Sequence, residues 1–327
     1  MKFLIIRFSS IGDVTQSLSI PAHILNTYPT AQIDILTKSE FKNLFQFSPF
    51  VNKIWTIEKQ INLKEIFKMS QDITAENYTH VYDAHNNLRS NLFYFLISAN
   101  HKLQRPMMRI KRFLLLKFKM NYFEKPFSGQ KDLLKPLEKW QIPFSLPATP
   151  QLFLDSDSEK FCSDFLLKNN LKKYIVLVPS AAYELKRWPI KQWQKLIELN
   201  PEKKFVVLAG PNDHFTQALN QFTNVINLTG QTTLSQSAAL IATATCIVSN
   251  DTGMLHFSEQ LGRPTIALMG PAPFGFPSRP TTKILERNLN CRPCSKHGQG
   301  PCVNKNYQEC LVDISPEEVS FEMNLKC

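Results

Sequence analysis

The chain has 327 residues, enough for two domains of ordinary size, and its 43% hydrophobic and 20% charged residues are typical of a globular protein. No apolar stretch approaches the roughly 20 residues that a helix needs to cross a bilayer, so we exclude membrane-spanning helices and expect a soluble protein. The 38 lysines and arginines against 27 acids give a formal charge of +11, which favours an anionic partner (nucleic acid, a phosphorylated substrate or an acidic membrane surface), with plain solubility as the alternative.

The first half of the chain predicts a parallel sheet. Short apolar or alternating runs occupy residues 3–7, 33–37, 54–57 and 80–83, with helix-like spacers between them. Strands that alternate with helices form a parallel sheet with helices on both faces. The first run is too short for a signal peptide and has no small-residue cleavage site after it, so we expect the first strand of a cytoplasmic protein.

The loop Ser9-Ser10-Ile11-Gly12-Asp13 follows the first of these strands. In an open parallel sheet, ligands bind beyond the carboxyl ends of the strands, where loops enter helices. Gly12 lets the backbone turn tightly or approach a ligand closely. Asp13 either caps the following helix or takes a proton from a substrate hydroxyl as a general base, and the residues alone leave both interpretations open.

A strongly basic stretch comes after the fourth strand. Between Ala84 and Phe123 there is no acid, and the segment RIKRFLLLKFKMNYF interleaves cations with large apolar residues. Such a segment can lie on anionic lipid, and the alternative is an ordinary helix whose apolar side packs on the first sheet. The cations of the stretch are Arg89, Lys102, Arg105, Arg109, Lys111, Arg112, Lys117 and Lys119.

Clustered prolines at positions 143, 147 and 150 predict an extended connection between two domains, residues 1–150 and 151–327. After this connection the alternation of strands and helices restarts. Apolar runs lie within residues 174–180, 204–210, 224–230, 246–253 and 264–271. The second half therefore has the stronger pattern of a doubly wound sheet.

The loop after the first strand of the second half ends in Lys186-Arg187-Trp188-Pro189. Pro189 suits the first turn of a helix, so the two cations lie at a helix entrance, against the helix dipole. That placement makes sense if an anion such as a nucleotide diphosphate lies between the cations and the helix. A solvated pair of surface charges is the alternative.

A similar arrangement occurs at Asp251-Thr252-Gly253, which follows another strand. Gly253 and the first amides of the next helix would suit a diphosphate. Asp251 would then accept hydrogen bonds from sugar hydroxyls, and His256 lies one helical turn further on. Alternatively, Asp251 is a helix N-cap and His256 is a satisfied helix histidine.

Four of the seven cysteines lie close together near the C-terminus, with the spacing Cys-x2-Cys-x7-Cys-x7-Cys and His297 among them. In a cytoplasmic chain, cysteines are expected to be free thiols or metal ligands, because disulfides do not persist there. Four thiolates would satisfy a structural zinc ion, although the second pair is wider than a short zinc knuckle. The predicted ligands are Cys291, Cys294, Cys302 and Cys310.

The segments IIRFSSIGDVTQSLSIPA, YDAHNNLRS, KRWP, SNDTGMLHFSEQLGRPTIALMGP and CLVDISPEEV resemble the ADP-heptose:lipopolysaccharide heptosyltransferases, glycosyltransferase family 9. The resemblance implies an α/β GT-B fold, with two Rossmann-like, doubly wound domains facing a central cleft. Residues 1–150 would hold the acceptor. Residues 151–327, with the Cys-rich segment 291–310, would hold the nucleotide-sugar.

The reaction that the resemblance implies is metal-independent and inverting, with no cofactor besides the ADP-heptose donor. Asp13 matches the base, which Gly12 would present to the acceptor hydroxyl by shaping a close-approach turn. Lys186 matches the phosphate-binding cation, and Ser180 is expected to replace hydrogen-bonding residues that family members often carry before this lysine. The other implied site residues are Arg187, Asp251, Thr252, Gly253 and His256 for the donor, and Ser10, Gly12 and Arg89 for the acceptor.

The predicted function is transfer of a heptose or related sugar from ADP-heptose to the lipopolysaccharide inner core. We expect a cytoplasmic enzyme, peripheral on the inner face of the inner membrane, with an anionic membrane surface as partner and no nucleic acid. One alternative is a zinc-containing, basic nucleic-acid-binding protein, which the charge and the cysteines favour. Another is a catalytically silent member of the family.

Overall fold

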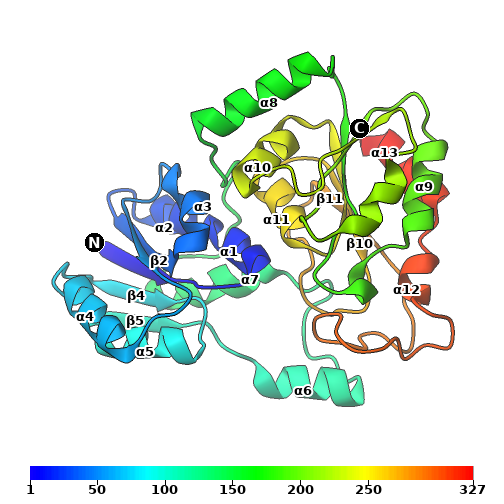
Figure 1. The fold of residues 1–327 in the computed structure, drawn as a ribbon. Coiled ribbons are helices and arrows are strands. Elements are labelled where there is room, and N and C mark those ends of the chain that lie inside the picture. Colours follow the sequence, from blue (N-terminus) through cyan, green and yellow to red (C-terminus); the bar gives the residue numbers. More distant parts are fainter. Residues whose placement is uncertain (327) are drawn as a thin grey trace. The chain divides into compact units, whose positions relative to one another are not determined.

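The computed structural model describes residues 1–326 and divides the chain into two compact units (Figure 1). The first unit comprises residues 1–108 and 129–153, and the second comprises residues 109–128 and the chain from residue 154 onward. Residues 142–155 form neither helix nor strand, as the clustered prolines predict. The chain passes into the second unit at residues 153–154, within this irregular connection.

The first unit contains a parallel sheet of five strands in the order β3-β2-β1-β4-β5. The four predicted strands are confirmed. The fifth, β5, is a short edge strand in which only Leu103 is buried, so it has no apolar run that the sequence could reveal. The strands are β1 (Lys2–Ile6), β2 (Gln32–Lys38), β3 (Lys53–Ile57), β4 (His80–Asp83) and β5 (His101–Gln104).

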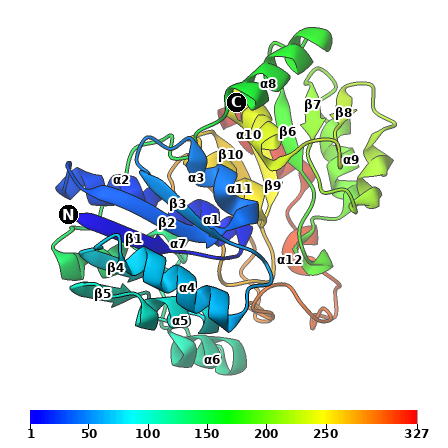
Figure 2. The same cartoon turned by 60° about the vertical axis from the view of Figure 1, so that its left-hand side comes forward.

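Helices cover both faces of this sheet (Figure 2). On one face, Leu4 and Ile6 of β1 pack with Ile73 of α4 and Phe93 of α5. Alternate residues of β1 point to the opposite face, where α7 contacts α1 and α2. The helices of this unit are α1 (Ile11–Ser17), α2 (Ser19–Thr27), α3 (Lys42–Gln46), α4 (Leu63–Thr74), α5 (Leu88–Leu96) and α7 (Gly129–Leu134), with 3₁₀ turns at Ser39–Phe41 and Lys135–Trp140.

The second unit contains a parallel sheet of six strands in the order β11-β10-β9-β6-β7-β8. All five predicted strands are confirmed. The sixth, β11, lies at the edge of the sheet and was not predicted, because Lys283 and Glu286 interrupt its apolar residues. The strands are β6 (Ile175–Val178), β7 (Phe205–Val207), β8 (Val225–Asn227), β9 (Cys246–Asn250), β10 (Thr265–Met269) and β11 (Thr282–Glu286).

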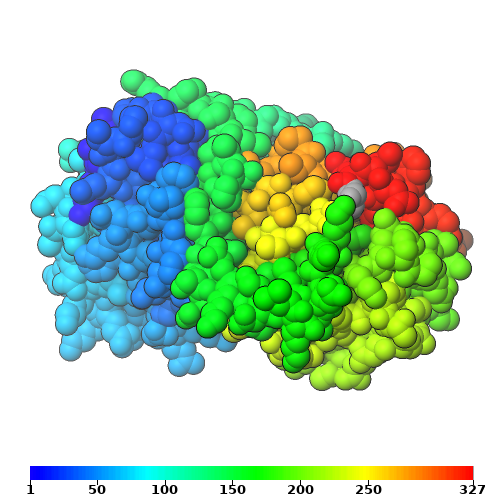
Figure 3. All heavy atoms as spheres, turned by 90° about the horizontal axis from the view of Figure 1, so that it is seen from above, coloured from blue at the N-terminus to red at the C-terminus, as the bar shows by residue number. Residues whose placement is uncertain are grey.

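Helices also cover both faces of the second sheet. Ile175 and Leu177 of β6 pack with Trp193 of α9 and Met323 of α13. On the other face α10 contacts α8 and α11, and Figure 3 shows the green surface of α8 beside the yellow surface of α10 and α11. The helices are α8 (Ser156–Lys168), α9 (Ile190–Glu198), α10 (Leu234–Thr243), α11 (Gly253–Gln260), α12 (Glu309–Val312) and α13 (Pro316–Lys326), with 3₁₀ turns at Glu184–Lys186 and His214–Leu219.

The basic segment 109–128 packs within the second unit, although the rest of residues 1–153 forms the first. It contains α6 (Arg109–Phe118), in which Leu115 is the buried residue. The rings of Phe123 and Phe127 lie 5.2 and 5.0 Å from that of Phe274, which follows β10. The alternative of a helix packed on the first sheet is therefore wrong, because these aromatic residues bind the segment to the second unit.

No helix within residues 1–326 is both long enough and apolar enough to cross a membrane.

Candidate active site

The predicted site residues lie at the topological switch point of each sheet. In the first sheet the switch is between β1 and β4, and the helices that follow these strands hold Asp13 and Arg89 in their first turns. In the second sheet it is between β6 and β9, which are followed by the loops that hold Lys186 and Asp251. Loops diverge at such a point and leave a crevice at the carboxyl edge of the sheet, which is where ligands bind in doubly wound folds.

Asp13 occupies the third position of α1, after the N-cap residue Ser10. Its Oδ2 accepts hydrogen bonds from the backbone N–H of Ser10 at 3.2 Å and from the Ser10 hydroxyl at 3.0 Å. The capping role is therefore confirmed. The side chain is nevertheless 42% exposed, so a substrate hydroxyl can reach it.

Asp13 also pairs with a buried cation that the sequence analysis did not select. Arg7, at the end of β1, places its guanidinium 2.9 Å from Asp13 Oδ2, and this side chain is 3% exposed. The same guanidinium donates to the carbonyl oxygen of Ala84 at 2.6 Å, which connects the loops after β1 and β4. A cation directly after an apolar strand is the sequence signal that could have marked Arg7.

The surroundings of Asp13 keep it ionised. Burial raises its pKa, but the charges of Arg7 and Arg105 and the hydrogen bonds from Ser10 outweigh burial and hold this pKa well below its ordinary value. Arg105 is itself fixed, since its Nε donates to Asp132 Oδ2 at 2.5 Å. The nearby His85 is neutral, because burial and Arg7 lower its pKa to about 3. Its Nδ1 accepts the N–H of Phe8 at 3.1 Å.

Gly12 does not form the tight turn that the sequence predicted. It lies in the first turn of α1 with helical backbone, and it is not among the glycines with positive φ. The prediction of a turn that needs glycine at this position is therefore wrong, since any residue can adopt this conformation, while close approach of a ligand to Gly12 stays a prediction. Arg89 lies in the first turn of α5, where Asn87 Oδ1 accepts the N–H of Ser90 at 2.9 Å and begins the helix.

In the second unit the two main donor-site predictions lie in direct contact. The ammonium of Lys186, at the end of a 3₁₀ turn, lies 2.6 Å from Asp251 Oδ2, after β9. Their side chains are only 15% and 6% exposed. Residues separated by 65 positions in the chain meet because β6 and β9 are neighbours in the sheet.

Two glycines allow other loops to pack against this ion pair. At Gly275, with φ +92°, a Cβ atom would lie 2.8 Å from Asp251 Oδ1. At Gly298, with φ +86°, it would lie 2.6 Å from Lys186 Cγ. Both positions thus need glycine, because the backbone has a positive φ and there is no space for a Cβ atom. The two loops therefore pack closely against the side chains of Asp251 and Lys186 and limit their movement.

Helix α11 begins directly after Asp251. Thr252 is its N-cap residue, and its side chain makes no capping hydrogen bond. The first N–H groups of α11 have no partner within the helix, so they can bind a diphosphate. The ion pair therefore lies directly before this helix N-terminus, since Asp251 and Gly253 are two residues apart.

Comparisons with known proteins show the family of this chain. The model of glycosyltransferase family 9 (heptosyltransferase) matches residues 66–308. The chain belongs to glycosyltransferase family 9. Lipooligosaccharide heptosyltransferase 2 of Haemophilus ducreyi is 28% identical over 99% of each chain.

Two solved structures have the same fold as this glycosyltransferase. The family 9 glycosyl transferase of Veillonella parvula has a TM-score of 0.82 and 18% identity, over 99% of this chain and 96% of that chain. The Escherichia coli heptosyltransferase WaaC with ADP-2-deoxy-2-fluoro heptose has a TM-score of 0.70 and 19% identity over 100% of both chains. The predicted GT-B class, with two Rossmann-like sheets, is confirmed.

Asp213 is a functional candidate of the glycosyltransferase that sequence reasoning missed. Its carboxylate lies 3.3 Å from the guanidinium of Arg187 and accepts the Ser180 hydroxyl at 2.5 Å. It also accepts the N–H of Gly210 at 2.9 Å. Asp213 therefore positions two predicted donor residues. Its place in the Gly-Pro-Asn-Asp turn after β7 was the available signal.

His256 lies deeper than a ligand-binding residue was expected to lie. It is 4% exposed, and its Nδ1 lies 2.9 Å from Glu259 Oε2. Glu259 Oε1 in turn accepts the N–H of Arg279 at 2.9 Å. These contacts fit the alternative of a satisfied helix histidine, while Asp251 is not the N-cap residue of α11.

The zinc site predicted in the Cys-rich segment is not confirmed. Among residues 1–326, no three or more His, Cys, Asp or Glu side chains are placed to hold a metal ion. Cys310 belongs to the hydrophobic core of the second unit, and burial raises the pKa of its thiol to about 11.

The Cys-rich segment instead supports the turn that carries Lys186. Gln299 Nε2 donates to the Tyr183 hydroxyl at 2.6 Å, and Gln308 Nε2 donates to the Glu184 carbonyl oxygen at 2.8 Å. The Tyr307 hydroxyl donates to Glu184 Oε1 at 2.7 Å. These contacts fix residues 183–186 from one side and thereby position the Lys186 ammonium.

Proposed function

We propose that this glycosyltransferase transfers a heptose from ADP-heptose to the inner core of lipopolysaccharide, with inversion at the anomeric carbon. The observation that carries the proposal is the Lys186–Asp251 pair, 2.6 Å apart, beside the uncapped N-terminus of α11. Support comes from the family model and from relatives such as the heptosyltransferase 2 of Haemophilus ducreyi. The WaaC structure holds ADP-2-deoxy-2-fluoro heptose, and a ligand of this class carries the diphosphate and the sugar hydroxyls that such a site accepts.

In the proposed donor complex, the second unit holds ADP-heptose. Lys186 has three N–H donors, so it can contact Asp251 and a diphosphate oxygen together. The backbone N–H groups at Thr252 and Gly253 hold the diphosphate, and Asp251 accepts sugar hydroxyls. Ser180 and Arg187, positioned by Asp213, complete the donor side. These groups stabilise the negative charge that the diphosphate gains in the transition state.

In the proposed acceptor complex, the first unit holds the reacting hydroxyl of the acceptor, with Asp13 as base and with Ser10, Gly12 and Arg89 around it. The acceptor oxygen forms a bond to the anomeric carbon while the bond from that carbon to the diphosphate oxygen breaks. The acceptor proton moves to Asp13, and ADP leaves with the electron pair. The charges of Arg7 and Arg105 keep Asp13 ionised before the reaction.

A transfer assay tests the proposal. Purified protein is incubated with ADP-heptose and a core acceptor that lacks the heptose, and the product is measured by mass spectrometry together with released ADP. Equal amounts of extended acceptor and ADP are expected. ADP binding without transfer would indicate a catalytically silent member, and the absence of any nucleotide binding would reject the donor site.

We further propose that the enzyme works as a cytoplasmic, peripheral protein on the inner face of the inner membrane, with α6 against anionic lipid. Ile110, Phe113 and Phe118 of α6 are 76%, 58% and 57% exposed. Arg109, Lys111 and Lys117 of the same helix are also exposed. Apolar side chains that enter the lipid and cations that meet its headgroups are the two features of an interfacial helix.

Replacing Arg109, Lys111 and Lys117 by glutamine should weaken binding to anionic vesicles about 100-fold, since each cation near such a surface contributes about 1 kcal/mol. Co-sedimentation with phosphatidylglycerol and phosphatidylcholine vesicles measures this. Phe321→Ser on α13, where Phe321 is 62% exposed, is the control and should bind as the wild type does. Equal binding of both vesicle types, or an unchanged triple variant, would rule out this role of α6.

A further inference from the structure

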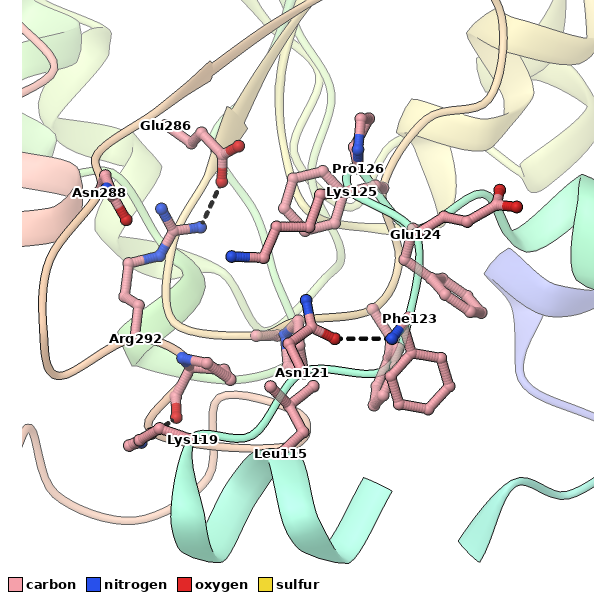
Figure 4. A pocket seen from close by; sticks show the side chains of 16 residues that line it. Leu115, Lys119, Asn121, Phe123, Glu124, Lys125, Pro126, Glu286, Asn288 and Arg292 are labelled. Atoms are coloured by element: carbon pink, nitrogen blue, oxygen red, sulfur yellow. Dashed lines mark hydrogen bonds and ion pairs between the residues drawn. The ribbon is translucent and has the colours of Figure 1, made fainter. Parts of the chain in front are cut away.

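The second unit contains a cavity that the proposed donor site does not use. It has a volume of about 400 Å³ and lies between residues 115–127 and the loops that follow β10 and β11 (Figure 4). Every residue that lines it belongs to the second unit. Because β10 and β11 continue the sheet beyond β9, the cavity lies at the same carboxyl edge as Asp251. Its size suits a small ligand such as a monosaccharide.

One wall of the cavity is aromatic. Phe123 and Phe127 meet Phe274 edge to face, with ring centroids 5.2 and 5.0 Å apart. The guanidinium of Arg112 lies 5.1 Å from the centre of the Phe274 ring. Residues from two distant chain segments thus pack together in this wall, so its surface is fixed by their contacts.

Two of the three cations in the cavity lining already have protein partners. Lys119 donates to the carbonyl oxygen of Cys291 at 3.2 Å and to that of Pro293. Arg292 lies 2.9 Å from Glu286 Oε2. These contacts join the segment after α6 to the loop after β11. They keep the cavity walls together and leave little of either charge for a ligand.

The third cation, Lys125, makes no ion pair or hydrogen bond with any residue from 1 to 326. Figure 4 shows its ammonium pointing into the space between Arg292 and Asn121. Asn121 Oδ1 accepts the N–H of Phe123 at 2.9 Å, so the amide group has its two N–H donors left for a ligand. Two carboxylates also line the cavity: Glu286 is paired with Arg292, and Figure 4 shows the Glu124 carboxylate pointing away from the Lys125 ammonium. The cavity therefore offers, beside an aromatic wall, hydrogen-bond donors and one positive charge that has no partner within residues 1–326.

This combination selects a class of ligand. An unpaired ammonium with amide donors binds a carboxylate or a phosphate. Aromatic rings pack against the C–H faces of sugar rings, which are apolar and weakly acidic. We propose that the cavity binds an anionic sugar, a sugar ring that carries a carboxylate or a phosphate, and that this sugar belongs to the acceptor. The assignment to the acceptor rests on the proposed function, whereas the binding of an anionic sugar does not.

Binding of soluble sugars tests the site without any transfer reaction. Methyl glucuronide and glucose 6-phosphate are the anionic probes and methyl glucoside is the neutral one, each titrated by saturation-transfer NMR. Lys125→Gln is expected to weaken the binding of both anionic probes about 10-fold, while Lys125→Arg should retain most of the affinity for them. Lys172→Gln, which removes an exposed cation elsewhere in the second unit, is the matched control and should change nothing. A preference for one anionic probe identifies the carboxylate or the phosphate as the natural group.

Transfer kinetics then separate this site from the donor site. In Lys125→Gln, KM for the core acceptor should rise about 10-fold, with kcat and the affinity for ADP unchanged. A loss of ADP affinity as large as the rise in KM would assign the cavity to the donor and overturn the proposal. Equal binding of the neutral and anionic probes would overturn it as well. If no transfer occurs but anionic sugars bind through Lys125, the proposed function fails and the sugar site stands.

Discussion

Asp13→Asn should lower kcat for heptose transfer by about 10²- to 10⁴-fold and leave the affinity for ADP unchanged, because the variant loses a general base. Asparagine keeps the size of the side chain, and its carbonyl oxygen can still accept the N–H of Ser10. It cannot take a proton. Transfer is measured by ADP release with saturating ADP-heptose and core acceptor, and ADP affinity is measured by calorimetry. Asp72→Asn, an exposed carboxylate on α4, is the matched control.

The pH dependence of the wild type gives the same assignment a second test. Arg7 and Arg105 outweigh burial and lower the pKa of Asp13, so the base is ionised above its folded-state pKa and is lost only as the pH falls through it. We therefore expect kcat/KM to stay flat from about pH 8 down to about pH 5, without an acid limb from this group. A limb near neutral pH, or an asparagine variant within threefold of the wild type, would place the base elsewhere.

Lys186→Ala should weaken ADP binding about 100-fold and lower kcat as well, since a nearly buried cation then no longer neutralises the diphosphate. The side chain is only 15% exposed, so water cannot fully replace it. Calorimetric titration with ADP measures the binding, and ADP release measures turnover. Lys191→Ala, which removes an exposed cation of α9, should behave as the wild type does.

A double variant separates contact with the ligand from support of Asp251. In Lys186→Ala the carboxylate of Asp251, which is 6% exposed, is left without its cation and repels the diphosphate. Adding Asp251→Asn removes that repulsion. If Lys186 binds phosphate, the double variant should still bind ADP at least about 10-fold more weakly than Asp251→Asn alone. Equal affinity of these two variants would mean that Lys186 only balances Asp251.

Local sequence patterns were sufficient for most of the sheets. Most of the predicted strands contain short runs of apolar residues, and those of β1, β6, β7, β9 and β10 are buried in the sheets, so their signal does not depend on distant residues. β5 and β11 escaped prediction because an edge strand has one neighbour and tolerates polar residues such as Lys102 and Lys283. The helices after β1 and β9 were found because a loop with glycine and an acid marks a helix start.

The candidate site was only partly visible in the sequence. Asp13, Lys186 and Asp251 could be selected because each follows a strand, and such positions meet at the carboxyl edge. Arg7 and Asp213 were missed, since a charge acquires its role from the groups packed around it. The turn predicted at Gly12 was wrong, because a glycine in a sequence does not show which backbone conformation it adopts.

The sequence by itself determined the two doubly wound halves, the proline-rich connection and the family, because these depend on local periodicity and on ordered motifs. Only the tertiary structure decided that residues 109–128 pack with the second unit, that Lys186 contacts Asp251 and that the Cys-rich segment supports the Lys186 turn. The physical reason is that these contacts join residues far apart in the chain. Strand order and loop packing, which no local pattern encodes, bring such residues together.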